Sequence, residues 1–87
     1  MSVIDQLTTI AATSANKSEA ICAKKLLKFA AAAKTKPWSP VEKQAKFMNI
    51  IKAYQKEIKD ANTPNDQFWR TFIGSQHHTT ALADLLA

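Results

Sequence analysis

The sequence predicts an all-α protein, built as a small compact bundle of four to five helices in a single domain over residues 1–87. Two observations predict this class. The 87 residues include only one glycine, and alanine, lysine, leucine, isoleucine and glutamine, which are tolerated or favoured in helices, are frequent. The chain also contains no run of alternating β-branched residues, which is the pattern typical of a strand.

The first predicted helix begins after Ser2, whose hydroxyl can cap an exposed backbone N–H group. Asp5 follows in the first turn, where its charge complements the helix dipole. The Asn-Lys-Ser segment at residues 16–18 supplies a turn and a new cap. A second helix is therefore expected over residues 19–34.

One side of this second helix is apolar and the opposite side carries lysines, as in an amphipathic helix. The apolar side holds Cys22, Leu26, Phe29, Ala30 and Ala33, and the opposite side holds Lys17, Lys24 and Lys28. The alanines present a thin surface that lets another helix approach closely. We expect a tight helix contact within the chain here, with an oligomer contact as the alternative.

The sequence SPVE at residues 39–42 is the clearest helix start in the chain. Ser39 occupies the capping position, Pro40 the first helical position, and Glu42 the third. Trp38, just before the cap, is expected to fold onto the first turns of the new helix as a hydrophobic staple. The stretch is therefore interpreted as the link that ends the second helix and starts the third.

The third helix is expected to run to about Ala61 with one narrow apolar face. Glu42 and Lys46, four residues apart on its outer surface, are expected to form an ion pair. The predicted apolar face holds Phe47, Ile51, Tyr54 and Ile58, flanked by Val41, Met48 and Ile50.

Two short helices are expected near the C-terminus. Residues 62–66 repeat the pattern of a cap followed by proline, and they predict a fourth helix that stops at Gly74. A last helical segment over residues 80–86 is too short to be stable unless it docks on another part of the protein. The fourth helix concentrates large apolar residues, namely Phe68, Trp69, Phe72 and Ile73.

The net charge of +5 favours acidic partners in general, and its distribution is uneven. Residues 17–36 contain six lysines and one acid, Glu19. Only one arginine is present, so sequence-specific DNA recognition is disfavoured, whereas nonspecific phosphate contact is not. A purely solvated face is the alternative interpretation. The candidate contacts to an anion or a nucleic acid are Lys17, Lys24, Lys25, Lys28, Lys34 and Lys36.

The sequence predicts no enzyme: no catalytic residue, no metal site and no cofactor. The adjacent His77 and His78 cannot chelate a metal together on a helix, and a solvated loop is expected for them. Cys22 lies on an apolar helix face, where burial raises the pKa of a thiol. An enzyme would require a pocket in which Cys22 or a histidine meets a base.

The cellular location predicted from the sequence is the cytoplasm. A single cysteine excludes an internal disulfide framework and fits a reducing compartment. The N-terminal residues lack the positive charge of a secretory signal. The longest apolar run, at residues 29–33, is far too short to span a membrane.

The leading functional hypothesis is a small non-enzymatic protein-interaction factor: a regulator, inhibitor or assembly accessory protein of bacterial or phage type that binds a protein partner. A nucleic-acid-binding protein that places the lysines of residues 17–36 on phosphates is the alternative. Association of the chain with itself, through the alanine face or the C-terminal leucines, is also open. Core packing is the favoured interpretation of Trp69, and a role as an interface anchor is the alternative. The candidate partner-binding residues are Trp69, Arg70, Leu82, Leu85 and Leu86.

Overall fold

The computed structural model describes residues 3–59, 65–72 and 78–86, and in these ranges the chain is helical without strands, which confirms the all-α bundle. The side chains of seven residues at helix ends, Lys59, Asp66, Thr71 and residues 78–81, are outside the description. The helices are α1 (Val3–Thr13), α2 (Lys17–Thr35), α3 (Pro40–Lys59), α4 (Asp66–Phe72) and α5 (His78–Leu86).

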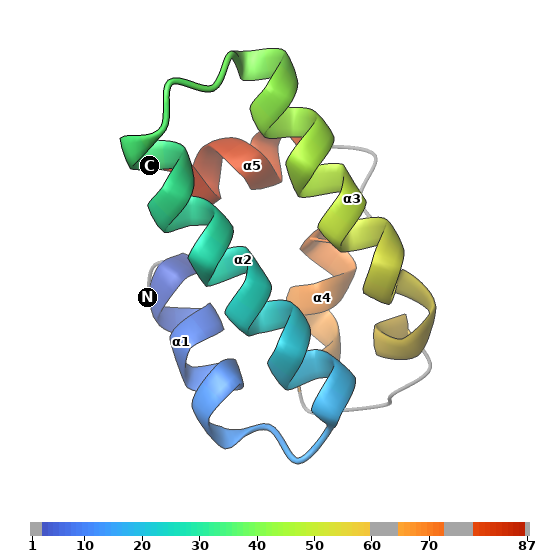
Figure 1. Ribbon diagram of the computed structural model, residues 1–87. Helices are drawn as coiled ribbons and strands as arrows, with labels where there is room; N and C mark the ends of the chain where they lie inside the picture. Colours follow the sequence, from blue (N-terminus) through green and yellow to red (C-terminus); the bar gives the residue numbers. More distant parts are fainter. Residues whose placement is uncertain (1–2, 60–64, 73–77, 87) are drawn as a thin grey trace.

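The long helices α2 and α3 run antiparallel and form the centre of the bundle (Figure 1). Helix α1 packs along α2, and α5 contacts each of the other four helices. In the view of Figure 1, α4 and α5 lie behind the α2–α3 pair. Within the described residues, the opposite side of this pair is therefore not covered by another helix.

Both long helices begin at the side-chain caps of their first turns. The Asn16 side chain accepts a hydrogen bond from the Glu19 N–H at 2.9 Å, so α2 begins at Lys17, two residues before the predicted start. The Ser39 hydroxyl oxygen accepts from the Glu42 N–H at 3.2 Å, which confirms the predicted start of α3. The predicted end of α3 at Ala61 lies outside the described residues.

Helix α1 begins at Val3, as predicted, and includes three threonines that are poor helix formers. The hydroxyls of Thr8, Thr9 and Thr13 each donate to the carbonyl four residues earlier, at 2.7–3.0 Å. These bonds satisfy the hydroxyls inside the helix without breaking it.

The expectations for the C-terminal part are met only partly. The predicted cap at residues 62–64 and the stop at Gly74 lie outside the described residues. Helix α5 begins at His78, two residues before the predicted start. The loop predicted for His78 is therefore wrong for its backbone, because this residue forms the first turn of a helix that docks on the bundle; His77 lies outside the described residues.

The core forms where the apolar helix faces meet. All five predicted apolar residues of α2 are buried, and so are Phe47, Ile51 and Ile58 of α3. Val41 is 78% exposed, because it lies in the first turn of α3 on the flank of the helix rather than over its core face. The other buried apolar residues are Leu7, Ile10, Ala23, Trp69, Phe72, Leu82 and Leu85.

The alanine face of α2 packs within the chain, since Ala30 and Ala33 are both buried. None of the helices in the described ranges is long and apolar enough to cross a membrane.

Candidate functional site

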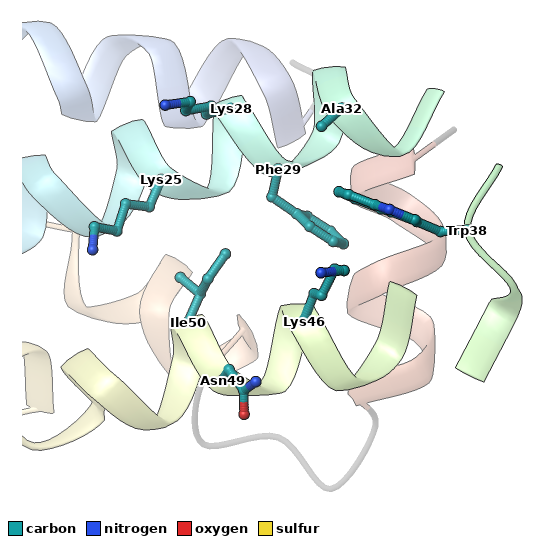
Figure 2. Close-up of a pocket in the computed structure, with 8 residues that line it drawn as sticks. All are labelled: Lys25, Lys28, Phe29, Ala32, Trp38, Lys46, Asn49 and Ile50. Carbon is teal, nitrogen blue, oxygen red and sulfur yellow. The ribbon is translucent and has the colours of Figure 1, made fainter. Parts of the chain in front are cut away.

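An open groove of about 380 Å³ lies between α2 and α3, and we call it the α2–α3 groove (Figure 2). Most of its surface is apolar, and three lysines stand around it. Its lining residues are Lys25, Lys28, Phe29, Ala32, Trp38, Lys46, Asn49 and Ile50.

Helical spacing explains why these residues share one groove. Lys25 and Lys28 are one turn apart on the flank of α2, and Lys46 and Ile50 are one turn apart on the flank of α3. Because α2 and α3 are antiparallel, the two flanks face each other across the groove (Figure 2). The groove therefore results from the same helix pairing that buries the core.

Trp38 closes one end of the groove and is half-buried. Its ring stacks on the ring of Phe29 in α2, with centroids 6.2 Å apart and planes 16° apart. The ammonium of Lys46 lies 4.7 Å from the centre of the Trp38 ring, in a cation–π contact. The predicted packing onto the first turns of α3 is therefore confirmed in part: the ring contacts Lys46 in the second turn of α3, and it also stacks on α2, which was not predicted.

The lysines of the groove have aromatic neighbours or solvent around them. The Lys25 ammonium lies 5.4 Å from the centre of the Tyr54 ring. Lys46 does not form the predicted ion pair with Glu42, because Lys46 contacts Trp38 and the Glu42 carboxylate accepts from the Ser39 hydroxyl at 3.4 Å. No carboxylate is among the residues that line the groove, so its local charge is positive.

All six lysines predicted to contact an anion are exposed. Lys25 and Lys28 line the groove, whereas the other four lie outside it. The sequence prediction did not include Lys46, which stands on the opposite wall. The spacing of four residues between Lys46 and Ile50 would have identified this lysine, because it places the two residues on the same flank of α3, the flank that faces α2.

The residues predicted to anchor a partner do not form an exposed patch. Trp69 is only 2% exposed, and Leu82 and Leu85 are also buried. Leu86 is half-buried, and Arg70 alone of the five is exposed. In this structure the large side chains of α4 and α5 complete the core.

Cys22 is fully buried beside Ala23 in the centre of α2. Burial raises the pKa of this thiol to about 12, against a small lowering by the charge of Lys25 and a further raising by Glu19. A thiol with this pKa stays protonated near neutral pH and is a poor nucleophile.

Glu19 is an unexpected core residue with an exposed fraction of 0%. One of its carboxylate oxygens accepts a hydrogen bond from the Asn65 side chain, just before α4. Among the residues that the structure describes, the other oxygen, Oε2, has no hydrogen-bond partner although it is buried, and the same holds for Nε1 of Trp69. This burial was not predicted, because an acid in the first turn of a helix also fits an exposed position.

Among the residues that the structure describes, no group of three or more His, Cys, Asp or Glu side chains could hold a metal ion. In comparisons with known proteins, the chain matches no protein-family model, no curated protein and no solved structure.

Proposed function

We propose that this protein is a small non-enzymatic interaction protein that binds an acidic partner protein through the α2–α3 groove. The observation that carries the proposal is the presence of three lysines around one open apolar groove. An apolar centre inside a charged rim is the usual anatomy of a protein interface. The lysines would attract an acidic surface and fix its orientation.

The burial of Trp69, Leu82 and Leu85 supports a contact surface on α2 and α3 rather than on α4 and α5. A chain of 87 residues has few large apolar side chains to spare from its core. Beside the lysines of the groove, half-buried Trp38 and Ile50 keep part of their apolar surface accessible.

The protonated, buried thiol of Cys22 supports the non-enzymatic part of the proposal, since this is the only cysteine in the chain. It also fits a reducing, cytoplasmic location. Within the broad class of interaction proteins, we favour a regulator or inhibitor. Such a protein would use the open groove to cover part of the partner's surface.

A nucleic-acid-binding protein is the second candidate, and it rests on the exposure of all six lysines between Lys17 and Lys36. Such binding would be dominated by phosphate contacts and would weaken steeply with added salt. The apolar floor of the groove favours the protein partner, because phosphates and sugars gain little from it.

The experiment that tests the proposal is affinity capture from an extract of the source organism, with and without nuclease. The bait is the full chain, compared with the Lys25→Glu/Lys28→Glu variant and with Lys52→Glu/Lys56→Glu, an equal charge change at exposed sites outside the groove. We expect the wild type and Lys52→Glu/Lys56→Glu to capture an acidic protein whether or not nuclease is added. Lys25→Glu/Lys28→Glu should not capture it. Capture of nucleic acid alone would favour the second candidate instead.

A further inference from the structure

The floor and the rim of the α2–α3 groove differ in chemistry. Phe29, Ala32 and Ile50 provide an apolar floor between the helices. An apolar side chain placed here would lose water-exposed area without leaving a polar group unpaired, and each large side chain so buried contributes about 1.5–3 kcal/mol.

The rim carries positive charge on both walls. Lys25 and Lys28 belong to α2, and Lys46 belongs to α3; in the view of Figure 2 the Lys25 side chain extends toward the α3 side, whereas Lys28 lies on the outer side of α2. A ligand with one apolar group in the floor would therefore meet an ammonium on either side. The complementary ligand has acidic groups on both sides of an apolar one.

We propose that the groove takes one large apolar side chain, such as leucine or phenylalanine, from an acidic segment of the partner protein, with carboxylates of that segment on the lysines of both walls. This inference rests on the proposed function and names the chemistry of the partner. The volume of about 380 Å³ is at the lower end of the range for small-molecule pockets, roughly 300–1,000 Å³, so one large side chain enters it without a rearrangement of the helices.

Ile21 indicates the direction in which the segment runs. It is 42% exposed and lies one turn before Lys25 on the same flank of α2. A segment that leaves the groove toward the start of α2 would cover this isoleucine and gain a second apolar contact. A nucleobase, whose face can stack on an aromatic ring such as Trp38, is the competing occupant, and the oligonucleotide probe in the test below distinguishes it.

The test uses two synthetic acidic peptides that differ only in the central residue, leucine or serine, each flanked on both sides by glutamates. Binding to the full-length chain is followed by NMR titration, with a single-stranded oligonucleotide of equal charge as the third probe. We expect the leucine peptide to bind about tenfold tighter than the serine peptide, because burial of the leucine adds more than 1.4 kcal/mol. We also expect the shifted resonances to include Phe29, Asn49 and Ile50.

A matched pair of substitutions locates the binding without touching the core. Ala32→Glu places a carboxylate in the groove at a half-buried position, and Ala31→Glu makes the same change at the neighbouring exposed position outside it. We expect Ala32→Glu to weaken the leucine peptide about tenfold and Ala31→Glu to weaken it less than about threefold. Thermal unfolding of both variants controls for the fold.

Failure of this inference can be separated from failure of the proposed function. If both peptides bind equally and Lys25→Glu/Lys28→Glu weakens both, the apolar anchor is refuted while acidic recognition stands. If neither peptide binds, or if the oligonucleotide binds more tightly than both and displaces them, the anchor and the acidic protein partner are both refuted.

Discussion

The ring of Phe29 in α2 stacks on the ring of Trp38, with centroids 6.2 Å apart, and also contacts the tilted ring of Phe47 in the core, with centroids 6.1 Å apart. The contacts continue from Phe47 to Phe72 at 5.9 Å. From there Phe68 lies 5.1 Å from both Phe72 and Trp69. A connected row of aromatic side chains therefore joins the groove to α4.

Trp38 stabilises the fold through this row. We expect Trp38→Ala to lower the free energy of unfolding by about 2 kcal/mol, because a half-buried ring and its stacking contact are lost. Trp38→Phe keeps a ring on Phe29 and should lose about half as much. Urea unfolding followed by circular dichroism measures both; an unchanged stability of Trp38→Ala would contradict the packing described for this residue.

Glu19 and Asn65 tie the start of α2 to the start of α4. We expect Asn65→Ala to cost about 2 kcal/mol, because it removes the side-chain donor that the described part of the chain places on the buried Glu19 carboxyl group. In a Glu19→Gln background the same change should cost about 1 kcal/mol, since the buried group is then neutral. A double-mutant cycle by urea unfolding gives the coupling, and additive effects would mean that the two side chains do not interact.

The raised pKa of Cys22 predicts a loss of stability in alkali. Below pH 9 the thiol is protonated in both the folded and the unfolded chain. Between the ordinary pKa of 9.0 and the folded-state pKa of about 12, the thiol ionises only in the unfolded chain. Between these values stability should fall by about 1.4 kcal/mol per pH unit from this group. Cys22→Ala removes this part of the slope, so its curve of stability against pH should be shallower; parallel curves would contradict the burial of the thiol.

The C-terminal leucines differ in burial, and their substitution should differ in cost. Leu85 is fully buried, so Leu85→Ala should lower the free energy of unfolding by about 3 kcal/mol. Leu86 is half-buried, so Leu86→Ala should lower it by about 1 kcal/mol. Urea unfolding together with light scattering tests this. If both substitutions lower the free energy of unfolding by the same small amount and change the oligomeric state, the leucines form a contact between chains instead of packing in the core.

Periodicity predicted the helices and their buried faces, because an apolar stripe repeats along α2 and α3 whatever the tertiary arrangement. The Ser39 cap was predicted for a similar reason, since its hydrogen bond to Glu42 involves neighbours in the chain. Contacts that depend on how helices meet were not predictable in this way. Buried Glu19, for example, is paired with Asn65, which lies 46 residues later in the chain.

The candidate site was predicted in part. Lys25 and Lys28 stood out because lysines cluster in one segment, but the opposite wall with Lys46 becomes apparent only when α3 lies beside α2. The contact of Trp38 with the first turns of α3 was predicted, but its stacking on Phe29 of α2 was not, since the path of a short loop decides which helices the ring reaches. The anchors expected at Trp69 and Leu85 are in the core, because an apolar residue on a short helix has the same sequence signal in both settings.

We assign the α2–α3 groove as the site that binds an acidic partner protein. Isothermal titration calorimetry tests this assignment by comparing the affinity of the captured partner for two variants with the same change in charge. Lys25→Glu/Lys28→Glu should weaken binding about tenfold or more, whereas Lys52→Glu/Lys56→Glu should weaken it less than about threefold. Equal effects of the two variants, or no effect of either, would contradict the assignment of the groove as the binding site.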